Sequence, residues 1–203
     1  DVFQKDPSVL FVGTGSDGIR SNVIVGKGVY KSKDAGSSWE FVGLENTGQI
    51  GAVKIHPENP DTVYVAAIGQ AFQPNSERGL YKTTDGGKTW ENVLFISDKI
   101  GIVDFEFSPE NPDILYAASW EVDRKPWTII SGSKAGGIYK SMDAGKSWIK
   151  LSEGLPTGNI GKIDLAVTPA DPNRLYALIE ADQGQGGVYV SYDNGGQFKA
   201  MSH

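Results

Sequence analysis

The chain has 203 residues, of which 39% are hydrophobic and 22% are charged, and its formal net charge is −6. These values are typical of a globular protein, and no apolar run approaches the roughly 18 residues of a membrane span. The acidic balance argues against a surface that follows nucleic-acid phosphates, so nucleic acid is not an expected partner. The absence of cysteine excludes disulfides and a cysteine nucleophile, and two histidines are too few for a histidine-rich metal site.

The sequence also predicts no cofactor and no metal. The glycine-rich segment 132–137 lacks the Gly-Lys-Ser/Thr ending of a phosphate loop, and no calcium-loop spacing occurs. The 26 glycines and ten prolines indicate many turns, which favour short strands over long helices.

The elements are expected in repeated units along the chain. Residues 1–43 form a partial unit with three strands, and the units 44–94, 95–151 and 152–203 have four strands each. The first strand of a unit alternates apolar and polar residues, as in 103–107, whereas the second is almost entirely apolar, as in 63–67. Such an apolar run suits a strand that is covered on both faces.

An octet links the third and fourth strands of every unit. It begins with Ser or Thr, has Asp at the third position and Gly at the fifth, and ends with an aromatic residue. Successive octet Asp residues are 51, 58 and 50 residues apart. The marked positions are Asp34, Gly36, Trp39, Asp85, Gly87, Trp90, Asp143, Gly145, Trp148, Asp193 and Gly195.

Each octet residue has a physical role in a tight turn. The short Asp side chain can accept hydrogen bonds from nearby backbone N–H groups, and the Gly supplies a positive φ. The Trp is expected to turn back and bury its ring, which is worth roughly 2–3 kcal/mol. The fourth copy ends in Gln197 and Phe198, so we expect either a looser turn or different packing there.

The octet resembles the Asp-box, or BNR, repeat. This resemblance implies an all-β fold, a β-propeller of four-stranded antiparallel blades, with residues 1–203 forming a single segment of about four blades. Family propellers usually have six or more blades, so the remaining blades of a larger protein are expected partners. A closed four-bladed ring with one borrowed strand is the alternative.

The repeated phrases look most like bacterial proteins described as glycosyl hydrolases with BNR or sortilin-like repeats. The family includes sialidases, xyloglucanase-type glycoside hydrolases and the sortilin ectodomain, and it implies a secreted, periplasmic or cell-surface location. Family active sites lie on the face opposite the Asp-boxes. The octet residues are therefore expected to be structural, and the lysines at Lys31, Lys82 and Lys140 to form a solvated rim.

The connections between second and third strands depart from the repeat, which makes them the expected binding face. The longest contains two Trp residues interleaved with charges, a composition that suits stacking on sugar rings and hydrogen bonding to hydroxyl groups. The alternative is that Trp120 completes the strand and Trp127 fills the core. The candidate contacts are Trp120, Glu121, Asp123, Arg124, Trp127, Phe72, Arg78 and Arg20.

Two enzymatic interpretations apply to the same connections. A sialidase needs three converging arginines, which Arg20, Arg78 and Arg124 could supply, but its Arg-Ile-Pro motif and its Tyr nucleophile are absent. A xyloglucanase-like hydrolase uses two carboxylates. Residues 11–18 loosely resemble the family phrase that carries one of them, which makes Asp17 the candidate, and the second would lie outside this chain.

The sequence thus favours a propeller segment that presents a face to a glycan or protein ligand. The alternative is a part of a xyloglucanase-type hydrolase, and a third interpretation is a purely architectural arc. On the first strands, Asp104 and Asp164 either line a central channel or are simply solvated.

Overall fold

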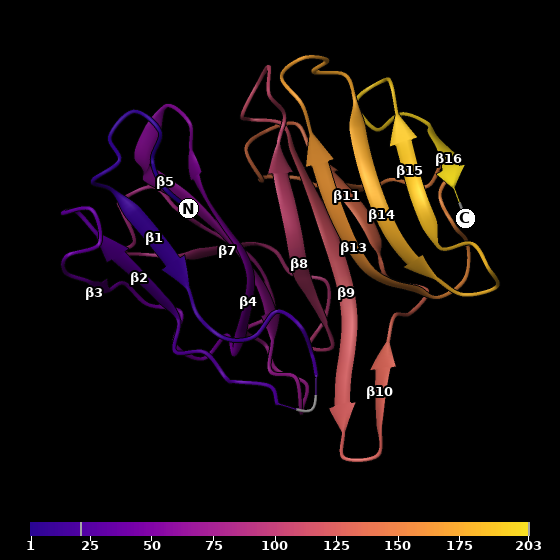
Figure 1. The fold of residues 1–203 in the computed structure, drawn as a ribbon, viewed down its shortest axis with the longest axis horizontal. Coiled ribbons are helices and arrows are strands. Elements are labelled where there is room, and N and C mark those ends of the chain that lie inside the picture. Colours follow the sequence, from indigo (N-terminus) through magenta and orange to yellow (C-terminus); the bar gives the residue numbers. More distant parts are fainter. Residues whose placement is uncertain (21, 203) are drawn as a thin grey trace. The chain divides into compact units, whose positions relative to one another are not determined.

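The computed structural model describes residues 1–20 and 22–202. Over this part of the chain it contains sixteen strands and no helix, arranged in four antiparallel sheets (Figure 1). The contacts divide the chain into two compact units, Asp1–Gly101 and Ile102–His203, with two sheets each. No helix that could cross a membrane is found among the described residues.

The first unit holds a three-stranded sheet and a four-stranded sheet, and both follow chain order. Each is a simple meander because every strand pairs antiparallel with the next one. The strands are β1 (Leu10–Gly13), β2 (Val29–Ser32), β3 (Glu40–Phe41), β4 (Gln49–His56), β5 (Asn59–Gly69), β6 (Gly79–Thr83) and β7 (Glu91–Leu94).

The second unit holds a five-stranded sheet and a second four-stranded meander. Strand β8 pairs with β9, which also pairs with β10 and β11. The strands are β8 (Ile100–Phe107), β9 (Leu115–Lys125), β10 (Thr128–Ser131), β11 (Gly137–Ser141), β12 (Ile149–Lys150), β13 (Ile160–Val167), β14 (Leu175–Ala181), β15 (Gly187–Ser191) and β16 (Phe198–Ser202).

These antiparallel sheets of three to five strands correspond to the blades of a β-propeller, and the predicted fold class is confirmed. One element was not predicted. The segment after residue 119, expected as a loop, continues β9 to Lys125 and returns as β10 through a two-residue turn. The reason is local, because the β-branched run Thr128–Ile130 favours a strand.

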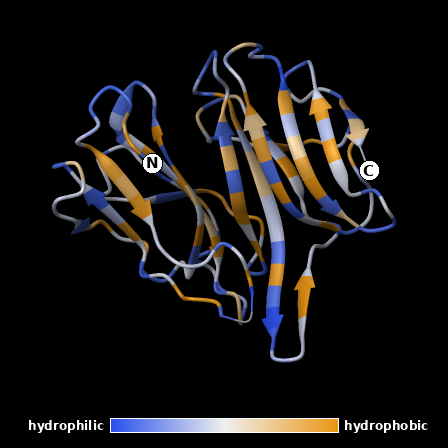
Figure 2. Ribbon diagram, viewed as in Figure 1, coloured by the Kyte–Doolittle hydropathy of each residue, from blue (hydrophilic) through white to orange (hydrophobic). Residues whose placement is uncertain are grey.

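The core of the first unit lies between its two sheets. Apolar side chains of β1 and β2 pack against those of β4 and β5, with Phe11, Val29, Val63, Val65 and Ala67 fully buried. The apolar run in β5 is covered on both faces, because Val63 to Ile68 are all buried. Figure 2 shows this pattern as hydrophobic residues along the strands and hydrophilic residues at many of the turns.

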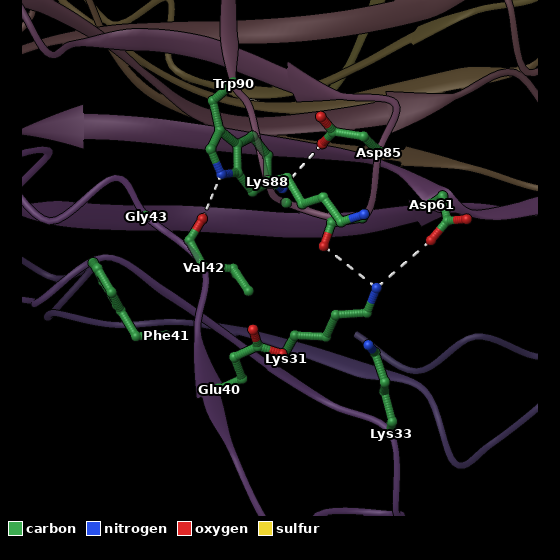
Figure 3. A pocket seen from close by; sticks show the side chains of 12 residues that line it. Lys31, Lys33, Glu40, Phe41, Val42, Gly43, Asp61, Asp85, Lys88 and Trp90 are labelled. Carbon is green, nitrogen blue, oxygen red and sulfur yellow. Dashed lines mark hydrogen bonds and ion pairs between the residues drawn. The ribbon is translucent and has the colours of Figure 1, made fainter.

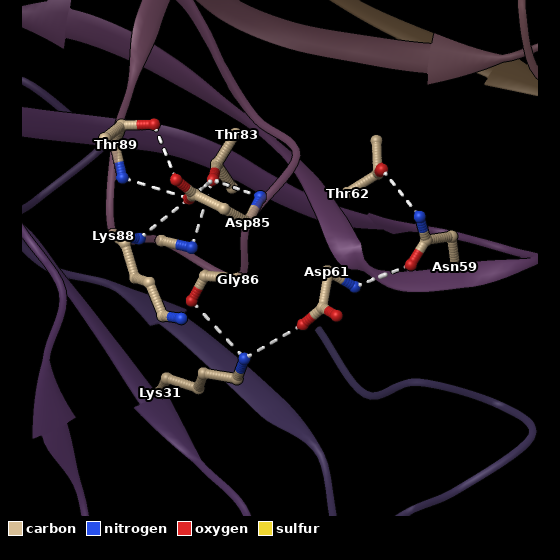
Figure 4. A network of polar contacts seen from close by, with 10 residues as sticks. Lys31, Asn59, Asp61, Thr62, Thr83, Asp85, Gly86, Lys88 and Thr89 are labelled. Carbon is tan, nitrogen blue, oxygen red and sulfur yellow. Dashed lines mark hydrogen bonds and ion pairs between the residues drawn. The ribbon is translucent and has the colours of Figure 1, made fainter.

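The octets form nearly identical turns, and the second is drawn in Figure 4. Asp85 Oδ1 accepts hydrogen bonds from the Thr83 hydroxyl and from the N–H groups of Lys88 and Thr89. Its Oδ2 accepts the Thr89 hydroxyl at 2.7 Å. The Thr83 hydroxyl oxygen also accepts the Gly87 N–H at 3.0 Å. One carboxylate and one hydroxyl therefore close the whole turn.

The fourth octet lacks one of these bonds. Asp193 accepts the Gln197 N–H at 2.9 Å, but Gln197 has no hydroxyl to donate to the second carboxylate oxygen. In the third octet the Ser147 hydroxyl is the largest cause that lowers the pKa of Asp143, to about 2. For Asp193 the pKa is also lowered, chiefly by the Ser191 hydroxyl.

The expectation that the octet Trp buries its ring is only partly met. Trp39 remains 43% exposed, whereas Trp90 is half-buried and packs against the core of the first unit. Trp90 Nε1 donates to the carbonyl oxygen of Val42 at 2.7 Å, and Val42 belongs to the preceding blade. The Trp90 ring therefore links its own blade to the preceding one through this hydrogen bond. Phe198, the departure from the pattern, is the most deeply buried of the four.

Two of the three third-strand lysines, Lys31 and Lys140, are not part of a solvated rim. Lys31 is only 7% exposed, and its Nζ lies 3.3 Å from the carbonyl oxygen of Gly86 in the next octet. In the second unit Lys140 Nζ donates to the Asn194 carbonyl at 2.7 Å, and it lies over the Tyr116 ring. The Tyr116 hydroxyl donates to the same carbonyl. Lys31 and Lys140 thus each join their blade to the octet turn of the following one.

One of the two first-strand carboxylates, Asp104, also joins two blades. Asp104 Oδ2 on β8 accepts the backbone N–H of Leu165 on β13 at 2.7 Å. Asp164 is exposed, with Lys162 Nζ at 3.9 Å. Asp104 is therefore neither a simply solvated side chain nor a free channel group.

We expect the octet carboxylates to make stability depend on acid pH. The pKa of Asp143 is about 2 in the folded protein against an ordinary value of 3.8, so its ionised form stabilises the fold above about pH 4. This contribution is lost as the pH falls through 2. Asp143→Asn should lower the Tm at pH 7, and its difference from the wild type should shrink between pH 4 and pH 2. Thermal melts across this range measure it.

The control for this experiment is Glu110→Gln, which removes the same charge from an exposed side chain. Its Tm should follow that of the wild type at every pH. A difference for Asp143→Asn that stays constant down to pH 2 would contradict the assignment of the pH dependence to the turn.

Lys140→Met tests the lysine bond between blades. The substitution keeps the apolar stem and removes the donor to Asn194, so we expect a loss of about 1 kcal/mol in the free energy of unfolding. Urea denaturation measures it. Lys146→Met, at an exposed lysine in the octet of the same blade, should cost much less, and equal losses would show that the bond has no special role.

Candidate functional site

The β9–β10 hairpin extends beyond the rest of its sheet (Figure 1). Strand β10 pairs with residues 122–125 of β9, whereas β11 pairs with residues 115–119. The distal part of the hairpin is therefore a two-stranded ribbon. Its turn consists of Pro126 and Trp127, and the Trp127 side chain is 81% exposed at the tip.

Trp120 fixes the base of this hairpin and is not a surface contact. Its side chain is only 4% exposed, and its Nε1 donates to the Ser131 hydroxyl at 3.0 Å. The Ser131 hydroxyl in turn donates to Glu180 Oε2 at 2.8 Å, which also accepts the Lys162 N–H. This relay ties the hairpin to the last blade of the same unit. Trp120 is thus a buried residue of strand β9, as the alternative interpretation of the sequence proposed.

The charged residues of β9 order the ribbon. Arg124 donates to the carbonyl oxygens of Lys125 and Thr128, so its guanidinium spans the turn. Asp123 Oδ2 lies 2.8 Å from Lys125 Nζ. Its Oδ1 is buried and has no hydrogen-bond partner among the described residues. The backbone carbonyl of Glu121 accepts the Gly132 N–H, and its side chain is half-buried.

Exposed apolar side chains gather at the distal end of the ribbon. Ile129 and Ile130 are 42% and 46% exposed, and Thr128 separates them from Trp127 in the chain. Figure 2 shows β10 as hydrophobic and the end of β9 beside it as hydrophilic. Successive strand residues point to opposite faces, so Ile129 and Ile130 do not form one patch, and the exposed indole of Trp127 is the feature that suits a binding surface. Trp127 does not fill the core, which rules out that alternative for this residue.

In the first unit Arg78 holds a loop in place. Its side chain is 1% exposed, and its two terminal nitrogens donate to the carbonyl oxygens of Ile68, Gln70 and Gln73. Gly69 makes room for it, because a Cβ there would lie 2.2 Å from Arg78 Cγ. Arg78 is therefore a structural residue, and the predicted ligand contact is corrected by its burial.

Phe72 lies on the loop that Arg78 holds, and it is 51% exposed. Asn75 closes the same loop, since its Oδ1 accepts the Gln70 N–H and its own N–H donates to the Asp98 carbonyl. Phe72 is thus an exposed ring on an ordered support, as Trp127 is in the second unit.

Asp17 and Arg20 lie on the connection between β1 and β2, and both are exposed. The base of this connection is closed by Thr14, whose hydroxyl donates to the Gly28 carbonyl and accepts the Lys27 N–H. It meets the Arg78 loop through Gly48, which accepts the Gly26 N–H and forms a bridge with Gly69. Both loops of the first unit therefore start from the same end of their sheets.

In the second unit the structure brings most of the predicted contact residues onto one hairpin. In the second unit Glu121, Asp123, Arg124 and Trp127 share one hairpin, which Trp120 supports from below. The residues that sequence reasoning missed are Ser131 and Glu180, which position the hairpin. The sequence gives little indication of their role, because each is a single polar residue at or near the end of a strand.

Curated relatives match much of the chain but only a small part of their own length. A xyloglucanase from Paenibacillus sp. is 26% identical over 155 residues, which cover 72% of this chain and 14% of that protein. The vacuolar protein sorting/targeting protein 10 of Colletotrichum graminicola is 30% identical over 105 residues, which cover 51% of this chain and 6% of that protein.

Solved structures confirm the propeller fold over almost the whole chain. The GH74 xyloglucanase from Xanthomonas campestris has a TM-score of 0.70 at 19% identity, covering 99% of this chain and 29% of that one. The GH74 enzyme of Niastella koreensis has a TM-score of 0.67 at 24% identity, covering 98% and 28%.

A family described as "Sortilin, neurotensin receptor 3" matches residues 27–154, which is more than half of the sequence. This span runs from the connection before β2 to the segment after β12 and contains three of the four octets. The chain therefore belongs to the Sortilin-Vps10 family.

Proposed function

We propose that this chain is a propeller segment that binds a glycan, with the β9–β10 hairpin as the main contact. The observation that carries the proposal is Trp127, a fully presented indole on an ordered ribbon. Indole rings stack on the apolar faces of sugar rings, and neighbouring charged groups bind the hydroxyl groups. Asp123, Arg124 and Glu121 supply such groups along the same hairpin.

The contacts that order the hairpin favour a binding role for Trp127. Trp120, Ser131 and Glu180 fix its base, and Arg124 spans its turn, so the backbone that carries the ring is ordered before a ligand arrives. A preordered contact loses less conformational entropy on binding than a flexible loop does. Export to the cell surface, the periplasm or the medium is part of this proposal, and the xyloglucanase relative favours it.

Trp127→Ala should abolish or strongly weaken glycan binding and leave the Tm unchanged, because the side chain is 81% exposed. Trp120→Ala is the matched comparison. It removes a buried ring and should lower the free energy of unfolding by about 3–5 kcal/mol. Binding on an array of plant and bacterial glycans, combined with thermal melts, measures both effects.

Full glycan binding by Trp127→Ala would overturn the proposal. A protein ligand that binds the wild type and is lost in Trp127→Ala, with no glycan bound, would assign the hairpin to protein recognition instead.

A second candidate function is a part of a xyloglucanase-type glycoside hydrolase. The xyloglucanase relative and the GH74 structures favour it, and Asp17 is the residue of this chain that could act as one of the two carboxylates. The second carboxylate would be supplied by residues outside the 203 of this chain.

Hydrolysis of xyloglucan by the complete gene product tests this candidate. We expect Asp17→Asn to reduce kcat by at least about 100-fold, because general acid–base catalysis contributes on that scale, with little effect on KM. Glu91→Gln, at another exposed carboxylate of the first unit, is the control. Unchanged hydrolysis in Asp17→Asn would remove Asp17 from the reaction.

A further inference from the structure

The second unit contains a small apolar pocket between its two sheets. Its volume is about 160 Å³, and it lies between β11 and β12 of one sheet and β13 and β14 of the next. A larger pocket in the first unit, of about 570 Å³, is lined by three lysines and three carboxylates, whose charges cancel (Figure 3). The small pocket differs because none of its lining residues is a carboxylate.

Branched aliphatic side chains form most of this lining. Four of them lie on the strands and are at most 7% exposed, and they are Ile138, Ile160, Ile163 and Ile179. The β12–β13 connection adds Leu151, Leu155 and Pro156. A cavity of about 150 Å³ lined by side chains of this kind holds one benzene molecule. The pocket therefore has room for one benzene-sized group.

The β12–β13 connection is held at both ends of the pocket. The Glu153 carbonyl accepts the Phe198 N–H at 2.9 Å, and Gly154 packs against the Phe198 carbonyl. On the other side, the Thr157 N–H donates to Gln185 Oε1 at 2.8 Å. The pocket is thus already formed without a ligand, so binding requires little ordering of the chain.

One ammonium group is placed at the edge of the pocket. Lys150 Nζ donates to the Lys134 carbonyl at 3.2 Å. Its stem crosses Gly137, because a Cβ there would lie 2.7 Å from Lys150 Cε and 3.4 Å from Nζ. Lys134 and Gly137 both line the pocket, which fixes where this charge lies. An ammonium has three donors, so Lys150 can still donate to a ligand.

Burial lowers the pKa of Lys150 below its ordinary value. The ammonium is therefore partly shielded from water, although the residue as a whole is exposed. A charge that has lost part of its hydration gains more from a nearby anion than a fully solvated one does.

The repeat shows how this pocket arises. Gly28 and Gly79, the counterparts of Gly137 in the first two blades, each pack against a backbone carbonyl at the end of their own blade. At Gly137 the nearest atoms belong to the side chain of Lys150 instead. The other blades have Phe41, Asn92 and Ala200 at the position of Lys150. The third blade is thus the one that places an ammonium here.

We propose that this pocket binds a small aromatic carboxylate, a single ring that carries one acid group. The ring lies against the isoleucines, and the Lys150 ammonium takes the carboxylate at the edge. The charge fits, because both charged residues of the lining, Lys134 and Lys150, are cations. Glu153 and Asp182 adjoin lining residues but do not line the pocket. A fatty acyl chain or a fused ring system is too large for about 160 Å³.

Titration of the chain with benzoate, followed through methyl resonances in NMR spectra, tests the proposal. Benzoate should shift the methyl signals of Ile163, Ile179 and Leu151 in a saturable way. Benzyl alcohol has a ring of the same size without the charge, and it should bind about fivefold more weakly, on the scale of a partly exposed charge pair. Naphthoate, which carries the same acid group on a larger ring, should not bind.

Lys150→Met keeps the stem over Gly137 and removes the ammonium. It should weaken benzoate binding about fivefold and leave benzyl alcohol binding unchanged. Lys146→Met, at an exposed lysine of the same blade, is the matched control and should change neither ligand. Trp127→Ala should also leave benzoate binding intact, which separates this site from the hairpin and from the glycan proposal.

Leu155→Trp tests the pocket itself. The larger side chain fills the space from the chain's own connection, so binding of both benzoate and benzyl alcohol should be lost. A Tm equal to that of the wild type shows that the variant is folded. If it does not fold, the Lys150→Met comparison still decides the proposal.

Three results would overturn the proposal. They are the absence of saturable shifts at the three methyl groups, equal affinity of the wild type for benzoate and benzyl alcohol, and equal weakening of benzoate binding by Lys146→Met. Shifts confined to the hairpin would place the binding of benzoate outside this pocket and would overturn it as well.

Discussion

The bond from a strand lysine to the octet carbonyl of the next blade decides where one sheet meets its neighbour. A single antiparallel meander of short strands cannot bury its apolar faces alone, so it needs a neighbour at a fixed position. Lys31 and Lys140 provide this position in the two units, because each ammonium reaches the one carbonyl that the octet turn presents. This bond adds about 1 kcal/mol to the packing of apolar side chains between the sheets.

The octet can present this carbonyl because its own polar groups are satisfied internally. The Asp carboxylate accepts two to four backbone and hydroxyl donors, and the first hydroxyl closes the turn from the other side. The turn is therefore rigid without help from the core. This explains why its aromatic residue can serve different roles, from the exposed Trp39 to the buried Phe198.

Much of the fold was readable from the sequence because it repeats. The octets and the apolar second strands gave the blades and their order, and the propeller class followed from the resemblance. The β10 strand was missed because it departs from the repeat, although Thr128–Ile130 favours a strand by its composition. The lysine bonds were missed because a recurring lysine on an outer strand is usually solvated.

The candidate site was only partly predictable, for a related reason. Trp120 and Trp127 are alike in the sequence, yet Trp120 is buried and Trp127 is exposed. The reason is that Trp120 lies within a strand, whereas Trp127 forms part of the two-residue turn. Arg78 appeared to be a ligand contact because it lies in an irregular loop. Its burial depends on Gly69, whose missing side chain leaves space that no pattern of charges reveals.

The β9–β10 ribbon has a consequence for how such chains diversify. It grows from two strands that are already paired, so added residues lengthen a ladder outward and leave the packing between sheets unchanged. A longer or shorter ribbon would move its tip by whole pairs of residues while Trp120 and Glu180 keep the base fixed. Descendants of one scaffold can therefore reach ligands of different size by changing the length of this arm alone.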